Sequence, residues 1–263
     1  LKDDYKLATL SRGYKRKTKG FQLANEDSNA GSIGDEPFQF YSKFKNSIAI
    51  AVDSNRQNGI ENLQNSDPDV ILLDDAFQHR KVQAGFNILL TTYAKPYYKD
   101  MVLPTGDLRE PKNGSARAHF IVVTKCPMGL SDFDKSEVIK RISPKAHQSV
   151  FFSSIVYSDI LLSVDEPKAL NKLDDFTLVT GIANARPLVR FLKEKHLSFE
   201  HLNFKDHHDF SQQDINGLKN KDLIITTEKD FMRLKQYEAL KDKLYYLPIT
   251  MTIVKAFEFN QQI

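Results

Sequence analysis

Short apolar runs alternate with helix-periodic stretches along most of the 263 residues of this chain. Runs of β-branched and aromatic residues, bounded by turn residues, predict strands that are buried on both faces. The predicted strands are Leu7–Leu10, Ile48–Val52, Val70–Leu73, Asn87–Leu90, Phe120–Thr124, Val150–Tyr157, Thr177–Thr180, Phe199–Phe204, Leu223–Thr226 and Tyr245–Ile249. The predicted helices are Arg56–Gln64, Asp134–Ile142, Asn184–Glu194, Gln212–Leu218 and Phe231–Leu240. Because strands that alternate with helices form parallel βαβ units, the pattern predicts an α/β fold.

The alternating pattern breaks at Ser143-Pro144-Lys145, which is the best candidate for a domain boundary. We expect a first α/β domain over residues 1–148 and a smaller α/β domain over residues 149–263. The polar stretch Asn25–Gly34 contains glycine and serine, and we expect it to form a mobile loop.

The composition excludes several classes of protein. Hydrophobic residues make up 41% and charged residues 27% of the chain, as in an ordinary soluble globular protein. The net charge of +3 does not by itself imply a polyanionic partner. Cys126 is the single cysteine, which excludes an intrachain disulfide and fits a reducing compartment. No apolar run approaches the roughly 18 residues that a membrane span requires.

The most informative segment is Val-Ile-Leu-Leu-Asp-Asp-Ala-Phe-Gln-His-Arg, from Val70 to Arg80. It predicts a buried strand that ends in two adjacent carboxylates, Asp74 and Asp75. Ligands of open α/β sheets bind beyond the carboxyl ends of the strands, and carboxylates there commonly hold a Mg²⁺ that phosphates also bind. A strand followed by an aspartate helix cap and a polar turn fits the same residues. Both interpretations stay open at this stage.

A basic cluster follows the first predicted strand, with five cations between Arg12 and Lys19. It predicts a surface that binds the phosphates of an anionic glycolipid or an anionic membrane leaflet. A solvated basic loop is the simpler alternative. Nucleic-acid binding is disfavoured, because only Tyr14 interrupts the run and single-strand binders place several aromatic residues among their cations.

Four further motifs stand at characteristic separations from Val70–Arg80. They are Ser11-Arg12-Gly13-Tyr14, Gly34-Asp35-Glu36-Pro37, Leu103-Pro104-Thr105-Gly106-Asp107-Leu108-Arg109-Glu110-Pro111 and Thr226-Thr227-Glu228-Lys229-Asp230. In this order the set resembles the tetraacyldisaccharide 4'-kinase family, the lipid A 4'-kinases, over nearly the whole chain. The resemblance implies a P-loop-kinase-like (RecA-like), mostly parallel sheet flanked by helices, followed by a smaller α/β domain across a cleft.

The resemblance also implies an activity and a location. Members of the family use ATP and Mg²⁺ to phosphorylate the 4'-hydroxyl of a lipid A precursor, an acylated disaccharide 1-phosphate. The expected location is the cytoplasmic face of the inner membrane, so the membrane surface is an expected partner. The resemblance implies neither a nucleic-acid partner nor a protein partner.

Two catalytic residues follow from the resemblance. Asp35 matches the family's catalytic aspartate, and a carboxylate that is ionised near neutral pH suits removal of a proton from a sugar hydroxyl. From the residues alone, Asp35 fits equally well as the N-cap of a helix with Pro37 in its first turn. His207, by its place after Asp206, matches the histidine that works with that aspartate, and the adjacent His208 competes for the role. Ordinary loop histidines remain the alternative for both.

Other residues are expected at the phosphates and at the acceptor sugar. Arg56 follows a predicted strand end and resembles a family arginine, although a surface arginine is an equally simple interpretation. Arg109 offers a fork of donors to a phosphate, and Glu110 would add a carboxylate beside Asp74 and Asp75 around Mg²⁺. Gln78 is assigned to the nucleotide side. The residues assigned to the substrate are Arg12, Tyr14, Lys15, Arg16, Lys19 and His79.

The motif at Thr227–Asp230 fits a helix capping box, with Thr227 as the N-cap and Asp230 three residues later. This local role explains the spacing of the motif without any catalytic function. We therefore leave the motif out of the catalytic set.

The chain departs from the family in one respect. The P-loop run Gly-x-x-x-x-Gly-Lys-Ser/Thr is absent, and the sequence opens at Leu1 without a methionine. We expect a truncated chain, without the family's P-loop and N-terminal membrane helix, that is inactive or nearly so. The loss matters because the P-loop backbone and its lysine hold the phosphates.

Two rival functions belong to other classes. The first is a non-catalytic module that binds anionic lipid or RNA through Arg12–Lys19, which would gain nothing from Asp74, Asp75 and Glu110. The second is a P-loop ATPase or GTPase with a protein partner. The absence of an Asn-Lys-x-Asp motif counts against the GTPase form.

Overall fold

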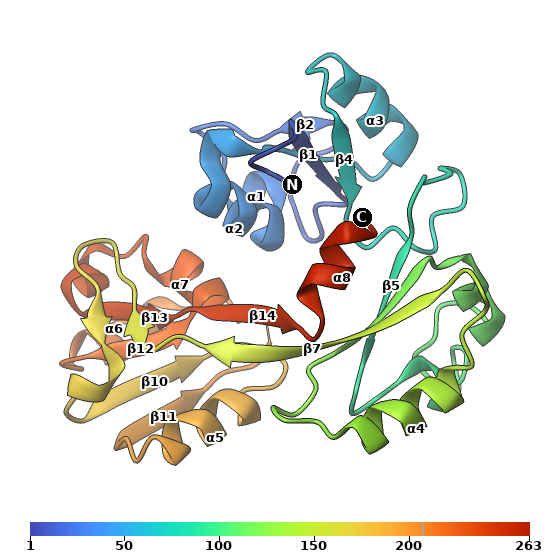
Figure 1. Ribbon diagram of the computed structural model, residues 1–263. Coiled ribbons are helices and arrows are strands. Elements are labelled where there is room, and N and C mark those ends of the chain that lie inside the picture. The colour runs from blue at the N-terminus through green and yellow to red at the C-terminus, as the bar shows by residue number, and fades with distance from the viewer. Residues whose placement is uncertain (207) are drawn as a thin grey trace. The chain divides into compact units, whose positions relative to one another are not determined.

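The computed structural model describes residues 1–206 and 208–263 and shows an α/β protein with three four-stranded sheets, mostly parallel and flanked by helices (Figure 1). This confirms the predicted fold class. The chain forms two compact units, each made of two stretches of sequence. The first unit comprises Leu1–Asp74 and Tyr157–Ile249, and the second comprises Asp75–Val156 and Thr250–Ile263.

The first sheet of the first unit has the strand order β2-β3-β1-β4. β1 pairs in parallel with both β3 and β4, whereas the short β2 pairs antiparallel to β3. Alternate side chains of the sheet pack on α3 on one face and on α2 on the other. The elements are β1 (Leu7–Ser11), β2 (Gln22–Leu23), α1 (Ala30–Ile33), α2 (Asp35–Phe44), the 3-10 helix η1 (Lys45–Ser47), β3 (Ala49–Val52), α3 (Arg56–Gln64) and β4 (Val70–Leu73).

The second sheet of the first unit is entirely parallel, in the order β11-β10-β12-β13. One face packs on α5, and the other packs on α6 and α7. The elements are β8 (Ile160–Leu161), β9 (Lys168–Ala169), η4 (Leu170–Lys172), β10 (Phe176–Thr180), α5 (Arg186–Glu194), β11 (Phe199–Asn203), α6 (Gln212–Lys219), β12 (Ile224–Thr227), α7 (Glu228–Leu234), η5 (Glu238–Lys243) and β13 (Leu244–Leu247).

The second unit contains one sheet in the order β14-β7-β6-β5. Ile121 and Val123 pack beneath α4, and the alternate residues Phe120 and Val122 pack beneath α8. The single cysteine, Cys126, is buried in the cluster under α4. The elements are β5 (Ile88–Thr92), η2 (Tyr97–Lys99), η3 (Lys112–Arg117), β6 (Phe120–Thr124), α4 (Asp132–Ile142), β7 (Ser149–Tyr157), β14 (Ile249–Ile253) and α8 (Ala256–Gln261).

Most predicted elements are present. Three elements have the predicted bounds: Val70–Leu73, Phe120–Thr124 and Arg56–Gln64. Most of the others differ from the prediction by one or two residues at an end. One predicted helix and one predicted strand are each interrupted, and one predicted loop contains a helix. The predicted loop Asn25–Gly34 contains the short helix α1, which begins with a capping box between Asn29 and Ser32.

The predicted helix Phe231–Leu240 is wrong as a single element. α7 ends at Leu234, and a separate 3-10 helix covers Glu238–Lys243. Leu234 and Leu240 are both completely buried in one hydrophobic cluster. Residues six apart point in different directions on a continuous α-helix, so both can reach that cluster only if the helix is interrupted.

The predicted strand Tyr245–Ile249 is also wrong as a single strand. Pro248 separates β13, in the second sheet of the first unit, from β14, which lies beside β7. Proline has no N–H group to donate to a neighbouring strand, which explains the break at this residue.

The compact units do not coincide with the predicted segments 1–148 and 149–263. β7 begins at Ser149, but it pairs in parallel with β6 from Ser149↔Phe120 to Phe152↔Val123 and so completes the same sheet. Ser143 ends α4 in a left-handed conformation, so the predicted break is a helix end within the second unit. The assignment of 1–148 and 149–263 as functional domains stays a prediction.

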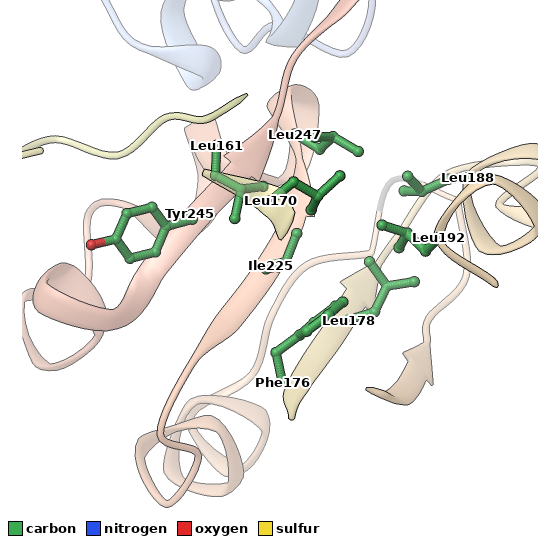
Figure 2. Packing of buried hydrophobic residues seen from close by; sticks show 9 residues of the cluster. All are labelled: Leu161, Leu170, Phe176, Leu178, Leu188, Leu192, Ile225, Tyr245 and Leu247. Carbon is green, nitrogen blue, oxygen red and sulfur yellow. The ribbon is translucent and has the colours of Figure 1, made fainter. Parts of the chain in front are cut away.

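The largest apolar side chains of the second sheet converge under α5 (Figure 2). Leu178 of β10 and Ile225 of β12 point toward Leu188 and Leu192 of α5, and Leu178, Ile225 and Leu192 are completely buried. Burial of such a side chain contributes on the order of 1.5–3 kcal/mol. In the described part of the chain, no helix combines the length and the hydropathy that a bilayer span requires.

Leu192→Ala should lower the free energy of unfolding by about 2–5 kcal/mol, because it leaves a cavity in a closed core. Denaturant-induced unfolding followed by circular dichroism measures this change. Arg190→Ala on the same helix is the control. It removes only an exposed pair with Glu194 and should cost about 0.5 kcal/mol or less. Equal effects of the two substitutions would contradict the assigned face of α5.

Candidate active site

The parallel strands of the first sheet end at one edge, where polar residues gather, among them the predicted metal ligand Asp74. Ser11 ends β1, Asp53 follows β3 and Asp74 follows β4. The chain passes from β1 to β3 on one side and then returns to β4 on the other. The edge beyond β1 and β4 is therefore a topological switch point, where open α/β sheets bind their ligands. The Ser11 hydroxyl is buried there with no hydrogen-bond partner among the described residues, and sequence reasoning had not singled it out.

Arg56 braces this edge from the start of α3. It is 3% exposed, and its guanidinium donates to the backbone carbonyls of Asp53 and, at 3.0 Å, Asp74. The alternative of a surface arginine is therefore wrong. A contact between Arg56 and a phosphate stays a prediction, because the described hydrogen bonds show the residue holding two strand ends together.

The basic loop Arg12–Lys19 folds against α1 and the start of α2. Lys17 N donates to Gly31 O at 2.8 Å, and the Thr18 hydroxyl donates to Ser32 O at 2.6 Å. Gly34 has φ +95°, and a Cβ placed on it would lie 3.0 Å from Tyr14 O. The two motifs Ser11–Tyr14 and Gly34–Pro37, which are distant in sequence, therefore meet in space. This contact depends on the absence of a side chain at residue 34.

The predicted substrate-binding residues of this loop differ in exposure. Arg12, Tyr14, Lys15 and Lys19 are exposed. Arg16 is half-buried, and its guanidinium donates to Gly20 O at 2.6 Å and Val52 O at 3.4 Å. Burial lowers the pKa of Arg16, although the charge of Asp53 opposes this change. Arg16 therefore stabilises the loop, while its neighbours present charge at the surface.

Asp35 is the first residue of α2, which corrects the alternative that made it the N-cap. Gly34 occupies the cap position and makes no side-chain hydrogen bond. The carboxylates of Asp35 and Glu36 lie in the first turn, where the helix dipole stabilises negative charge. The predicted base is thus half-buried at a helix start that directly contacts the backbone of the basic loop.

The acidic pair after β4 begins at Asp74, whose N–H donates to Leu10 O at 3.0 Å. Asp75 has φ +45°, a left-handed conformation that aspartate tolerates better than most residues. In the second unit, Arg109 Nη1 lies 3.0 Å from Asp75 Oδ2, and both side chains are well exposed. No helix follows at this point, so the alternative of an aspartate helix cap is wrong.

Glu110 lies within a cluster of arginines in the second unit. Its carboxylate accepts from Arg117 at 2.7 Å and from Arg80 at 3.2 Å. Although burial raises the pKa of Glu110, these two hydrogen bonds bring it below its ordinary value. Gly114 makes room for the group, since a Cβ there would lie 2.6 Å from the carboxylate carbon. Glu110 as a metal ligand stays a prediction, and it would require the carboxylate to exchange an arginine for the metal.

Gln78 is exposed and His79 is half-buried in the turns after Asp75. The ring Nδ1 of His79 is buried and has no hydrogen-bond partner within the described residues of the chain. The position is consistent with a contact to a bound ligand, but the assignment of Gln78 to the nucleotide and His79 to the substrate stays a prediction.

Two neighbouring histidines follow β11, and only one of them, His208, is among the described residues. His207 lies outside the described residues. His208 is held in place, because Nε2 lies 3.0 Å from Asp214 Oδ2 and its ring stacks on Phe204 at 4.7 Å between centroids. These contacts leave Nδ1 of His208 without a role in the pair with Asp214, so the choice between His207 and His208 stays a prediction.

Thr227 caps α7 as predicted, and its hydroxyl accepts from Asp230 N. Sequence reasoning missed the larger role of Asp230, whose carboxylate accepts a hydrogen bond from Gly181 N at 2.8 Å and pairs with Arg233. The capping pattern had already explained the spacing of these residues, so nothing in the sequence indicated a contact with residue 181.

A cavity of about 940 Å³ lies at the carboxyl ends of β10 and β11. Four cations line it, three of them on one helix, against two acidic residues. The cations are Arg186, Arg190, Lys193 and Lys205, and the acidic residues are Glu194 and Asp206. The excess of positive charge suits an anionic ligand.

No three His, Cys, Asp or Glu side chains gather to form a metal site by themselves within residues 1–206 and 208–263. Mg²⁺ does not need such a cage, because it is usually held by one or two carboxylates together with phosphates and water. The oxygen donors of Asp74 and Asp75 suit this ion. The exposed pair between Asp75 and Arg109 is of a kind worth only about 0–1 kcal/mol, so it is easily exchanged.

A carboxylate at a helix start beside a basic loop, with an acidic pair at a strand end, is typical of α/β enzymes of the phosphotransferase class. The family model for tetraacyldisaccharide-1-P 4'-kinase matches residues 1–263. The chain belongs to this family of kinases, which confirms the resemblance inferred from its motifs.

Relatives agree with this assignment, and a solved structure shares the fold. A tetraacyldisaccharide 4'-kinase of Flavobacterium johnsoniae is 49% identical over 97% of this chain and 76% of its own length. One from Bacteroides fragilis is 42% identical over 100% of this chain and 76% of its own length. The structure of LpxK from Aquifex aeolicus in complex with ATP has a TM-score of 0.74 and 24% identity, and it covers 98% of this chain and 78% of that chain. This likeness supports the fold.

Gly34→Ala should destabilise the protein by about 1–3 kcal/mol, because alanine is strained at φ +95° and its methyl group would press on Tyr14 O. Gly217→Ala is the matched control. Residue 217 lies inside α6 with open space around it, so the substitution should stabilise the protein by about 0.5–1 kcal/mol. Thermal unfolding measures both, and a neutral Gly34→Ala would refute the close contact of the two motifs.

Proposed function

We propose that the protein transfers the γ-phosphoryl group of ATP to the 4'-hydroxyl of a tetraacyldisaccharide 1-phosphate, a precursor of lipid A. The observation that carries this proposal is the contact between the Gly13–Tyr14 turn and the helix start at Gly34-Asp35. It puts a carboxylate beside a loop of exposed cations. An acceptor that carries its own phosphate needs both, a base for its hydroxyl and positive charge for its anionic group.

In the proposed reaction, Asp35 accepts the proton of the sugar hydroxyl as the oxygen attacks the γ-phosphorus. The new P–O bond forms while the bond to the bridging oxygen of the β-phosphate breaks, and ADP leaves with the electron pair. We assign the support of Asp35 to His207 by its place after Asp206 in the motif. Catalysis of this kind is mostly positioning and stabilisation of charge.

The nucleotide side of the site is proposed from the strand ends. Asp74 and Asp75 would hold Mg²⁺, which, when bound, neutralises the phosphate charge. Arg109, once separated from Asp75, would be available to a phosphate, with Arg56, Gln78 and Glu110 in supporting places. The buried Ser11 hydroxyl offers a hydrogen bond at the same edge.

The proposed binding to a membrane surface is argued from the basic loop. Arg12, Lys15 and Lys19 are exposed and carry charge of the sign that anionic lipids attract, at about 1 kcal/mol per cation. We place the enzyme at the cytoplasmic face of the inner membrane, where ATP and the lipid precursor are both accessible. Arg12, Tyr14, Lys15, Arg16, Lys19 and His79 are the proposed contacts to the precursor.

The decisive test is transfer of radiolabel from γ-labelled ATP to the purified lipid precursor by protein made from the complete gene. Asp35→Asn should lower kcat by a factor on the order of 10²–10⁴, as removal of a general base does, with little change in the KM for ATP. The control is Asp27→Asn, an exposed aspartate of the same unit. Wild-type protein without transfer would refute the function, and full activity of Asp35→Asn would refute the base.

Asp74→Asn and Asp75→Asn should raise the Mg²⁺ concentration needed for half-maximal rate and lower kcat, because each removes charge from the proposed metal environment. Initial rates against Mg²⁺ concentration measure this. Asp69→Asn, at the other end of β4, where the carboxylate accepts Lys6 N, is the control. If all four curves coincide, the acidic pair has only a structural role.

A further inference from the structure

The second sheet of the first unit has its own switch point, and a buried ion pair lies there. β10 leads through α5 to β11 on one side, and the chain then returns through α6 to β12 on the other. Ligands of such sheets bind beyond the carboxyl ends of the two central strands. Here Asp230 and Arg233 of α7 contact Gly181, which follows β10, and Asp230 also contacts Thr227, the last residue of β12.

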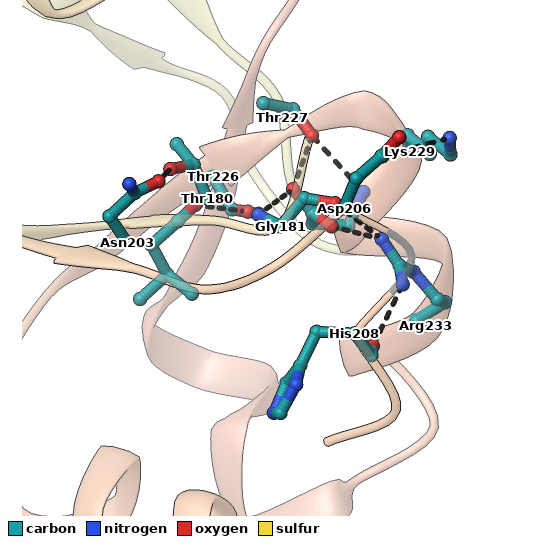
Figure 3. Close-up of polar contacts among 11 residues, drawn as sticks. Thr180, Gly181, Asn203, Asp206, His208, Thr226, Thr227, Lys229 and Arg233 are labelled. Carbon is teal, nitrogen blue, oxygen red and sulfur yellow. Dashed lines mark hydrogen bonds and ion pairs between the residues drawn. The ribbon is translucent and has the colours of Figure 1, made fainter. Parts of the chain in front are cut away.

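Arg233 links this pair to the loop that precedes α6. Its Nη1 donates to His208 O at 2.8 Å, and Nη2 lies 3.3 Å from Gly181 O and also contacts Asp230 (Figure 3). Asp230 is completely buried, and the side chain of Arg233 is 11% exposed. One planar guanidinium thus fixes two backbone carbonyls and a carboxylate at once, which a lysine side chain cannot do.

α7 contacts the same loop a second time. Lys229 Nζ lies 3.8 Å from Oδ1 of Asp206, the residue before position 207. Arg233 donates to the carbonyl of His208, the residue after position 207. Both backbone neighbours of His207 are therefore connected to the first two turns of one helix.

The same helix also contacts the element that begins with the proposed base. Glu228 lies 3.7 Å from Lys43 of α2, and Lys235 lies 5.4 Å from the ring centroid of Phe38. Asp35 is the first residue of α2. α7 is therefore a common support for the two segments that carry Asp35 and His207.

Stability alone does not explain a buried ion pair. Apolar residues of similar volume often stabilise a core as well or better, because the charges lose their hydration. A buried pair does select one arrangement, since any other leaves a charge unpaired. We infer that Asp230 and Arg233 are positioning residues for phosphoryl transfer, because they hold the carbonyl of His208, next to position 207, and the turn at Gly181. This inference rests on the proposed function and deepens it.

Arg233→Lys is the informative variant, because it keeps the charge beside Asp230 and loses the fork that reaches His208 O and Gly181 O. We expect kcat to fall on the order of 10- to 100-fold, as misplacement by about 1 Å can cost, with the KM for ATP within about threefold of wild type. Hydrogen exchange of residues 204–210 and of Gly181 should become faster. Asp230→Asn should show the same pattern.

Two controls separate positioning from a general loss of stability. Lys221→Met breaks the pair with Glu200 at the opposite end of the same sheet and should change neither kcat nor exchange in the loop. Leu192→Ala lowers stability from the core under α5 and, at a temperature where it remains folded, should keep kcat within about twofold. A loss of kcat in Leu192→Ala as large as that in Arg233→Lys would overturn the inference.

A double-mutant cycle with His207→Ala shows through which residue Arg233 acts. If Arg233 positions His207, then Arg233→Lys has no further effect on kcat in the His207→Ala background. Multiplicative effects, or a wild-type kcat for Arg233→Lys, would overturn the inference while leaving the kinase proposal intact. Wild-type protein that transfers no phosphate would instead refute the proposed function itself.

Discussion

The parallel pairing of β1 with β3 and β4 is the constraint on which the first site depends. Because all three strands run the same way, Ser11, Asp53 and Asp74 arrive at one edge although they are widely separated in sequence. Arg56 then fixes the distance between two of these strand ends through their backbone carbonyls. This pairing therefore determines where the basic loop after β1 and the acidic pair after β4 lie. It also determines the position of α2, which starts at Asp35 and packs on the same sheet.

Much of this arrangement was accessible from the sequence, for physical reasons. Runs such as Val70–Leu73 are short, apolar and bounded by polar residues, so strand identity and bounds follow from local pattern. The strand ends then place Asp74 and Asp75 at the sheet edge. The prediction from local pattern was wrong where tertiary packing interrupts an element. The sequence pattern predicts one helix that contains both Leu234 and Leu240. Both residues reach the same hydrophobic cluster because the helix ends at Leu234 and a separate 3-10 helix follows.

What the sequence could not supply was the partner of each polar side chain. Arg109 and Glu110 are predicted to contact a phosphate and a metal ion, which stays a prediction, and the sequence did not indicate that Arg109 pairs with Asp75 or that Glu110 pairs with Arg80 and Arg117. Arg56 was predicted to contact a phosphate, with a surface arginine as the alternative, and it is buried and donates to two backbone carbonyls. Asp230 was predicted as the third residue of a capping box that starts at Thr227, and it also holds the turn after β10. Several of these contacts, such as Arg109 with Asp75 and Asp230 with Gly181, join residues more than 30 positions apart, and no spacing rule along one chain predicts them.

The buried Cys126 has a practical consequence for the study of motion in this enzyme. Its thiol donates to Val123 O, and burial raises its pKa, so little of the reactive thiolate forms near neutral pH. Reagents that alkylate surface thiols should therefore pass it over. Because Cys126 is the single cysteine of the sequence and is buried, the chain exposes no native thiol. A fluorophore or spin label can be attached at one engineered position without first removing a native group from the core beneath α4.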